Sequence, residues 1–358
     1  MYAPKNLVIS GVISARPCQS TKEYSSEDRM IVLMGPTGTG KSAFIEALAS
    51  KSPDGRLGIS KNQLESVTKV ATVYQLENVK DKLGCYINIV DTPGMADPDI
   101  SELQVLKGVE RWRDECNNYN NTRALYFHSI TDPRMPGTKK RCLEIMQAFW
   151  GNYNAEPTSL VTSMWNTLTE KARKKAEMRR EDMGDLEKDF WGDWKDKGSR
   201  ILKFDNTYDS ALEVLDAICV GANRLEDEPR ITGLKMKNTK TDKFILEEEL
   251  RERFSQLKQE LNTITDNLND PEAKTNAEWR NAVLQEQSTA TRRLRAVVQD
   301  LADFLGVSPS ELLGDSTPQP SLETGVSSSA KQKGITGRLK GWIKPRWPHR
   351  SALEKNKI

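Results

Sequence analysis

The stretch Gly35-Pro-Thr-Gly-Thr-Gly-Lys-Ser42 decides the fold class of this chain. It follows the pattern G-x-x-x-x-G-K-[ST], in which backbone N–H groups wrap a phosphate and glycines let the chain approach it closely. Lys41 would reach the β- and γ-phosphate oxygens, and Ser42 would offer its hydroxyl to Mg²⁺. We therefore expect a phosphate site formed by the whole stretch: Gly35, Pro36, Thr37, Gly38, Thr39, Gly40, Lys41 and Ser42.

The flanking residues give the stretch the context that a phosphate loop needs. An apolar run predicts a buried strand at 30–34, and apolar residues at helical spacing predict a helix at 41–50. The N-terminus of that helix adds its own attraction for an anion. A glycine-rich turn without a ligand would give no reason for the Lys-Ser pair, so we expect a nucleotide-binding loop.

Apolar strands and amphipathic helices alternate from Arg29 to about Asn223. This alternation predicts an α/β fold, a three-layer P-loop NTPase with a mainly parallel sheet covered on both faces. Ligands of such sheets lie at the carboxyl ends of the strands. Strands are expected at 30–34, 67–76, 84–90, 123–130, 158–163 and 200–204, and helices at 41–50, 102–119, 138–150, 167–197 and 208–222.

Composition divides the chain into a central domain and flanking segments. Residues 1–28 are expected to form an irregular N-terminal segment, and 29–230 the P-loop domain. Leucines at four- and three-residue steps predict a helical, coiled-coil-like region at 240–306, either a hairpin folded back on the P-loop domain or a coiled coil between chains. Residues 307–334, rich in Ser, Thr, Pro and Gly, predict a disordered linker, and 335–358 form a basic tail with tryptophans.

The net charge of +2 is small because the positive charge of this basic tail is largely offset by an acidic remainder of the chain. Residues 331–358 hold nine Lys or Arg and one Glu, so they carry +8 and the rest of the chain −6. A mildly acidic body makes nucleic acid an unexpected partner. The tail is expected either to contact an anionic membrane surface or to be a solvated or targeting segment. Scattered cysteines and the lack of an apolar stretch long enough for a bilayer predict a cytoplasmic protein, peripheral at membranes if the tail binds them.

A second motif, Asp91-Thr-Pro-Gly94, follows an apolar strand. An Asp at this place holds Mg²⁺, usually through water, and the N–H of the Gly contacts the γ-phosphate until hydrolysis. Between the two motifs, Thr68 of Ser-Val-Thr-Lys is a candidate to complete the Mg²⁺ shell, with Thr72, Ser66 or a plain strand role as alternatives. The expected metal ligands are therefore Ser42, Thr68 and Asp91.

GPTGTGKS, SVTK and DTPG, in this order and spacing, resemble the septin-related GTPases. That group includes the immunity-associated GTPases and the chloroplast-import receptor GTPases. The likeness covers roughly 30–223 and is strongest to fungal proteins described as G-domain-containing. It implies a Ras-like fold, GTP or GDP with Mg²⁺ as ligands, slow hydrolysis, and dimerisation across the nucleotide face.

The residues that would read the base depart from this family. Guanine is normally read by [NT]-K-x-D after the fifth strand, whereas Thr162-Ser-Met-Trp165 leaves no carboxylate here. Thr162 fits the pattern, and Trp165 is expected either to stack on the base or to fill the core. After the sixth strand, Asn206 is expected to touch the base and Asp205 is a candidate substitute carboxylate, unless the segment only caps a helix. We therefore expect weak selectivity between GTP and ATP.

Hydrolysis needs a positioned water and stabilisation of charge at the γ-phosphate. Met95 stands where small GTPases place a Gln, so one protomer has little with which to orient water. In the import-receptor GTPases the loop after the fourth strand carries an Arg that reaches across a dimer, and Arg134 matches it here. The alternative is a surface ion pair with Asp132 or Glu102. The expected catalytic residues are Thr68, Gly94 and Arg134.

Three functions fit these residues. The first is a Mg²⁺-dependent GTP-binding switch that hydrolyses GTP slowly and forms homodimers across its nucleotide face or through its C-terminal helices. The second is a scaffold that binds nucleotide with little or no hydrolysis. The third is an NTPase with relaxed base specificity that accepts ATP or GTP.

Overall fold

The computed structural model describes residues 2–20, 23, 25, 27–53, 57–60, 70–116, 121–132, 137–151, 154–182, 191–219, 240–270 and 276–313. The chain divides into two units, Met1–Gly314 and Asp315–Ile358, and every described residue belongs to the first. The basic tail and the membrane contact predicted for it lie outside the described residues and stay predictions. No helix in the described part of the chain has the length and apolarity that a bilayer span requires.

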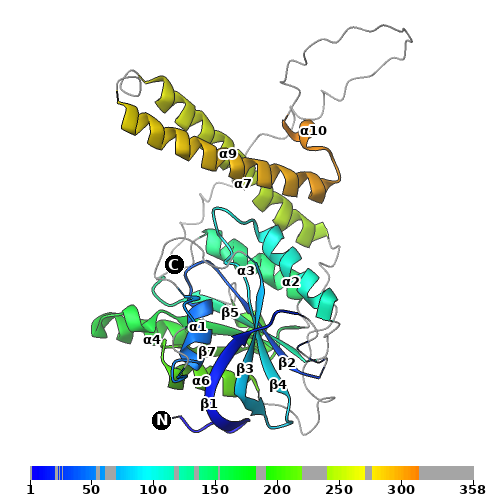
Figure 1. Ribbon diagram of the computed structural model, residues 1–358, viewed down its shortest axis with the longest axis vertical. Coiled ribbons are helices and arrows are strands. Elements are labelled where there is room, and N and C mark those ends of the chain that lie inside the picture. The colour runs from blue at the N-terminus through cyan, green and yellow to red at the C-terminus, as the bar shows by residue number, and fades with distance from the viewer. Residues whose placement is uncertain are drawn as a thin grey trace, which may run out of the picture. The chain divides into compact units, whose positions relative to one another are not determined.

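Within the described residues, one seven-stranded sheet forms the centre of the fold, in the order β1-β3-β4-β2-β5-β6-β7 (Figure 1). Strands β2, β4, β5, β6 and β7 run parallel, whereas β3 is antiparallel to β4 and β1 to β3. The strands are β1 Leu7–Pro17, β2 Arg29–Met34, β3 Thr72–Asp81, β4 Tyr86–Asp91, β5 Thr122–Ser129, β6 Thr158–Ser163 and β7 Arg200–Lys203. The phosphate-loop stretch follows β2, a central strand, which puts the loop in the middle of the carboxyl edge.

The residues of β2 show how the layers form. Side chains alternate between the two faces of a strand, and every residue of this strand is buried. Met30, Val32 and Met34 pack with helices α2 (Glu102–Cys116) and α3 (Gly137–Trp150). Ile31 and Leu33 pack on the other face with α1 (Lys41–Leu48) and α6 (Tyr208–Ile218). The three-layer α/β P-loop fold predicted from the sequence is confirmed.

The prediction of an irregular segment over 1–28 is wrong for its central part, which forms β1. Ile13 and Ala15 of this strand are buried, while Val8 and Val12 are exposed. Its register against β3 shifts between Ile9 and Ser14. An edge strand with one buried face needs few apolar residues, and the irregularity breaks the alternation that marks a strand in the sequence. The partner strand β3 likewise extends to Asp81, beyond the predicted 67–76.

The single helix predicted at 167–197 is also wrong. The described residues there form a 3₁₀ turn at Trp165–Thr167, helix α4 at Glu170–Asp182 and helix α5 at Asp193–Asp196. Trp191 and Trp194 are buried, and the Trp191 ring stacks on Tyr126 of β5 with 6.3 Å between ring centroids. Large aromatic rings therefore pack on the sheet, and the charged helix α4 adds Ala176 to the same core.

The C-terminal helices pack on each other and on the P-loop domain. Helix α7 (Lys240–Asn269) and helix α9 (Ala277–Leu305) lie side by side, and α7 contacts α3 (Figure 1). Leu246 and Leu250 of α7 are buried in the core of the P-loop domain. Further along α7, Ile264 forms a separate small core with residues of α9. The arrangement agrees with the predicted hairpin folded back on the domain.

The start of the linker predicted as disordered, 307–334, is instead a short helix, α10, at Pro309–Leu313. Ser308 Oγ accepts a hydrogen bond from Glu311 N at 3.3 Å, and Glu311 Oε2 accepts one from Ser308 N at 3.0 Å. This reciprocal cap, with proline at the first helical position, starts a helix in a segment whose composition suggests disorder. The part of the linker from 314 onward lies outside the described residues.

Candidate functional site

The loop of Gly35 to Ser42 joins the end of β2 to the start of α1. Gly38 and Gly40 have left-handed backbone angles, with φ of 78° and 88°. Lys41 Nζ donates to the carbonyl oxygens of Gly35 at 3.0 Å and Pro36 at 3.2 Å. The side chain thus folds back across its own loop, and burial lowers the pKa of Lys41 to about 8. A buried ammonium that donates to backbone carbonyls is well suited to exchange them for phosphate oxygens.

The two predicted Mg²⁺ ligands on either side of this loop lie next to each other. Ser42 Oγ donates to Asp91 Oδ2 at 2.7 Å, because β2 and β4 are adjacent parallel strands. A hydroxyl and a carboxylate are oxygen donors of the kind that Mg²⁺ prefers, and Mg²⁺ at nucleotide sites takes few protein ligands besides phosphates and water. Among the residues that the structure describes, no group of three or more His, Cys, Asp or Glu side chains could hold a metal ion. Thr68, the third predicted ligand, lies outside the described residues.

The DTPG segment docks directly on the phosphate loop. Met95 N donates to Gly35 O at 3.1 Å, and Thr37 N donates to Met95 O at 2.9 Å. Thr37 Oγ1 also donates to Asp97 Oδ2 at 3.2 Å. The Met95 side chain is fully buried in the core beneath the loop. An apolar side chain held there cannot itself orient a water.

Gly94 is the point of closest approach between the two segments. A Cβ built on Gly94 would lie 2.5 Å from Thr37 Cα and 2.7 Å from Thr37 N, and would overlap Thr37 Oγ1. Any side chain at this position therefore forces the DTPG segment away from the phosphate loop. The close fit at Gly94 and the hydrogen bonds of Met95 therefore hold this glycine, which is predicted to contact the γ-phosphate, against the phosphate loop.

We expect Gly94→Ala to lower the free energy of unfolding by about 1–3 kcal/mol, the usual cost of an overpacked site. Urea unfolding of the parent and variant measures it. Gly108→Ala in α2 is the matched control, because nothing lies within 4 Å of its Cβ and alanine favours a helix by about 0.5–1 kcal/mol. Adding Thr37→Gly should restore only part of the loss, since the Thr37 backbone remains in the way. Equal stability of Gly94→Ala and the parent would contradict this close approach.

The segment after β6 meets the other end of the phosphate loop. Ser163 Oγ donates to Thr39 O at 2.7 Å, and Thr162 Oγ1 donates to Leu202 O at 2.9 Å. Trp165 is fully buried, and its Nε1 donates to Thr162 O at 3.1 Å. Lys203 Nζ covers the ring at 4.2 Å from its centroid. The expectation that Trp165 stacks on a base is wrong for this conformation, because its ring has no exposed face; it fills the core.

Asp205 and Asn206 follow β7 at the same edge. Asn206 is exposed and has a left-handed backbone, with φ of 55°. Thr207 caps helix α6 together with Ser210, as the capping alternative predicted for this segment. Asp205 accepts hydrogen bonds on both carboxylate oxygens from Arg173 Nη2, at 2.7 and 2.8 Å. Sequence reasoning did not find Arg173, because it lies on α4, 32 residues from its partner.

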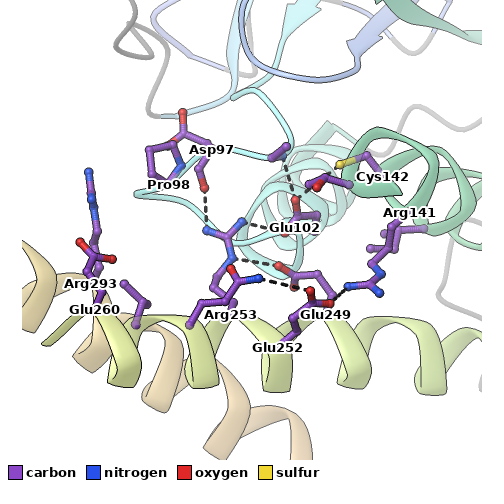
Figure 2. Close-up of a pocket in the computed structure, with 15 residues that line it drawn as sticks. Asp97, Pro98, Glu102, Arg141, Cys142, Glu249, Glu252, Arg253, Glu260 and Arg293 are labelled. Atoms are coloured by element: carbon purple, nitrogen blue, oxygen red, sulfur yellow. Dashed lines mark hydrogen bonds and ion pairs between the residues drawn. The ribbon is translucent and has the colours of Figure 1, made fainter. Parts of the chain in front are cut away.

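Both C-terminal helices contact the loop that follows DTPG. Arg253 of α7 donates to Asp97 O at 2.6 Å, to Glu102 Oε2 at 3.0 Å and to Glu249 Oε1 at 2.9 Å (Figure 2). Glu102 Oε1 in turn accepts from Ala96 N at 2.8 Å. Burial and the neighbouring Glu102 raise the pKa of Glu249 well above its ordinary value. These side chains line a cleft of about 270 Å³ between α7 and the loop.

Helix α9 contacts the same loop further along. Arg293 Nε donates to Asp99 Oδ1 at 2.8 Å, and Asp300 Oδ2 accepts from Ser101 Oγ at 2.7 Å and from Gln104 Nε2 at 2.9 Å. Residues 95–101 therefore touch the phosphate loop on one side and both C-terminal helices on the other. These contacts cannot be predicted from the sequence, because charged positions on long helices usually face solvent.

Arg134, the predicted catalytic arginine, lies outside the described residues. The two acids proposed as its alternative partners have other cations beside them. Asp132 Oδ2 accepts from Lys139 Nζ at 2.5 Å, and Glu102 pairs with Arg253. The role of Arg134 stays a prediction.

Residues 30–154 match the protein family described as 50S ribosome-binding GTPase. The match spans the phosphate loop and the DTPG segment. A search of curated proteins found no relative.

Three solved structures illustrate the fold-level similarity. The first comes from work on the chloroplast translocon components atToc33 and psToc159, which reports that dimerisation is important for their GTPase activity. It is 15% identical, covers 59% of this chain and 88% of that chain, and has a TM-score of 0.41. Toc33 from Arabidopsis thaliana with GDP and Mg²⁺ is 16% identical, with coverages of 63% and 86% and a TM-score of 0.35. A bacterial dynamin of an oligomerised pair is 13% identical, with coverages of 79% and 49% and a TM-score of 0.35.

Proposed function

We propose that this chain is a Mg²⁺-dependent GTP-binding protein that hydrolyses GTP slowly and acts as a switch by dimerisation. The observation that carries the proposal is the convergence of Lys41, Ser42, Asp91 and Gly94 on one glycine loop. Each group is within contact distance of that loop or of a residue in it. The family match over this segment supports GTP as the nucleotide.

The residues of the loop have separate roles in this proposal. The backbone of Gly35, Pro36, Thr37, Gly38, Thr39 and Gly40 surrounds the β-phosphate. Lys41 leaves its carbonyl partners for the β- and γ-phosphate oxygens. Ser42 and Asp91 hold Mg²⁺, with Thr68 as a third ligand in the GTP state. Bound Mg²⁺ would neutralise charge on the phosphates.

The γ-phosphate end of the site is where a change of nucleotide would change the conformation of the protein. The Gly94 N–H is proposed to contact the γ-phosphate and to release it on hydrolysis. Since Met95 is hydrogen-bonded to Gly35 and Thr37, a shift of Gly94 must be accommodated by residues 95–101. That loop is the segment contacted by α7 and α9, so nucleotide state and helix contacts are physically linked.

We expect hydrolysis to depend on protein concentration through Arg134. One protomer has little with which to orient water, since Met95 stands where small GTPases place a Gln. An arginine supplied across an interface can raise turnover by ~10³–10⁵. A weak self-dimer should give less, so we expect Arg134→Ala to lower turnover at least ~10-fold and leave nucleotide affinity nearly unchanged. Arg134→Lys should restore little of the lost turnover, because an ammonium cannot form the bidentate hydrogen bonds that a guanidinium makes to two phosphate oxygens.

Specific activity against protein concentration is the measurement, with single-turnover hydrolysis as its complement. Arg111→Ala, on the exposed side of α2, is the matched control and should behave as the parent. A flat concentration dependence with equal rates for parent and Arg134→Ala would exclude the trans-acting arginine. The alternative function, a nucleotide-binding scaffold with little hydrolysis, is favoured by the buried Met95 and would show as a negligible single-turnover rate.

The proposed partners besides nucleotide are a second copy, across the nucleotide face or through the C-terminal helices, and an anionic membrane surface. For the membrane, each basic residue of the tail near a headgroup layer contributes roughly 1 kcal/mol. We expect the full chain, but not residues 1–330, to sediment with acidic vesicles. Equal sedimentation of both would contradict the membrane contact.

A further inference from the structure

A buried carboxylate lies beside the place proposed for the γ-phosphate. Asp97 is 2% exposed, and its Oδ2 accepts a hydrogen bond from Thr37 Oγ1 at 3.2 Å. Thr37 also lies against Gly94, whose N–H is the proposed donor to the γ-phosphate. The Asp97 carboxylate and the γ-phosphate would therefore meet at the same residue of the phosphate loop.

Both hydrogen bonds that this carboxylate accepts come from uncharged groups. Besides the Thr37 hydroxyl, Asp99 N donates to Asp97 Oδ1 at 2.8 Å. Burial lowers the pKa of Lys41, and the carboxylates of Asp91 and Asp97 oppose that shift. The charge of Asp97 therefore acts on the residue that would hold the β- and γ-phosphates. A third phosphate adds negative charge beside Asp97, and like charges repel strongly where little water screens them.

Asp97 is joined to both C-terminal helices within a short stretch of chain. Its carbonyl oxygen accepts a hydrogen bond from Arg253 of α7 at 2.6 Å (Figure 2). Asp99 Oδ1 accepts from Arg293 Nε of α9 at 2.8 Å and from Arg292 Nη2 at 3.3 Å. A displaced Asp97 carboxylate loses its bond to Asp99 N and shifts the carbonyl that Arg253 holds. Charge at the phosphate loop is thereby transmitted to α7 and α9.

We propose that Asp97 distinguishes GTP from GDP by charge repulsion, so that GTP releases residues 95–101 from the α7–α9 hairpin and GDP leaves them clamped. This inference rests on the proposed function, since it names how the same site is regulated. The hairpin stays attached through Leu246 and Leu250, which are buried in the core of the P-loop domain. By reciprocity, the contacts that hold residues 95–101 on the hairpin weaken GTP binding relative to GDP binding.

The first measurement is equilibrium binding of GDP and of the non-hydrolysable analogue GMPPNP, both with Mg²⁺, to the full chain. Asp97→Asn should raise the affinity for GMPPNP relative to GDP by ~10-fold, because it removes the repelling charge. The new amide can accept from Asp99 N and donate to the Thr37 hydroxyl, so the local hydrogen bonds are kept. Asp266→Asn, the same change at an exposed position of α7, is the matched control and should keep the parent ratio.

Variants of the helix contacts test the other end of this connection. Arg253→Ala and Arg293→Ala should each raise the same affinity ratio by ~3–10-fold, because each removes a contact that holds residues 95–101 on the hairpin. The Arg293 pair with Asp99 is partly exposed, so Arg293→Ala provides the test if Arg253→Ala does not fold. Arg251→Ala, at an exposed position of α7, should leave the ratio unchanged.

Hydrogen exchange of the full chain reports the helices directly. In the parent, amides of α7 around Arg253 and of α9 around Arg293 should exchange faster with GMPPNP than with GDP, and Asp97→Asn should reduce that difference. Equal exchange in the two nucleotide states, or an unchanged affinity ratio in Asp97→Asn, would overturn the inference and leave the proposed function standing. A parent that binds neither nucleotide would contradict the proposed function and the inference together.

Discussion

Lys41→Ala is expected to abolish nucleotide binding at ordinary concentrations, with a loss of affinity for GDP and GTP of roughly 30- to 5,000-fold. That range corresponds to about 2–5 kcal/mol, the usual cost of removing one partner of a buried, hydrogen-bonded charge pair. The position of Lys41 favours a large effect on nucleotide affinity. Lys41 is 6% exposed and folded across the loop that would hold the phosphates, so no solvent cation can take its place.

The pH dependence of nucleotide binding provides a second test of the role of Lys41. Burial sets the pKa of Lys41 at about 8 in the free protein, so the side chain loses its charge as pH rises through 8. Affinity for nucleotide should then decline from pH 8 upward in the parent, and Lys41→Ala should lack that decline. Calorimetric or fluorescence titration from pH 7 to 9 measures it, with Lys82→Ala, an exposed lysine at the β3–β4 turn, as control. If Lys41→Ala bound nucleotide as tightly as the parent, the phosphate loop would not be the nucleotide-binding site.

Arg253→Ala is expected to lower the free energy of unfolding by about 3–5 kcal/mol, because it leaves a buried carboxylate without its cation. Glu102 is 2% exposed and Arg253 is its ion-pair partner at 3.0 Å. Loss of the guanidinium also removes the donor to Asp97 O, which joins α7 to the loop after DTPG. The variant should therefore lose its contacts between the helical hairpin and the P-loop domain before the domain itself unfolds.

Urea unfolding and hydrogen exchange across α7 test this effect. The matched control is Arg251→Ala, two residues away on the same helix. Arg251 is exposed and pairs only one turn away with Glu247, so its loss should cost less than about 0.5 kcal/mol. Equal losses for the two variants would mean that the hairpin is held by apolar packing of Leu246 and Leu250 and not by the Arg253 contacts.

The sequence predicted the phosphate loop and the layers around it because these depend on local patterns. The GPTGTGKS stretch has a fixed chemistry, and the five apolar residues of β2, Met30 to Met34, indicate a buried strand. The DTPG segment was placed at the end of its strand for the same reason. Strand β1 was missed, because an edge strand with Gly11 and a register shift carries too weak an alternation.

The contacts that complete the site could not be predicted, because they join residues distant in the chain. Arg173 meets Asp205 across 32 positions and Arg253 meets Asp97 across 156. Each is one of many charged residues on a polar helix, and a single sequence does not show which of them turns inward. The sequence leaves Trp165 open to a role at the base or in the core. The complete burial of its side chain, with Lys203 over the ring, decides for the core.

The most direct test of the account is an equilibrium titration of the purified full chain with GTP, GDP and ATP, each with and without Mg²⁺. We predict saturable binding of GTP and GDP at one site, tighter GTP binding with Mg²⁺ than without it, and ATP binding that is weaker by ~10–100-fold. Absence of binding by all three nucleotides, or ATP binding as tight as GTP binding with no effect of Mg²⁺, would contradict a Mg²⁺-dependent guanine-nucleotide site.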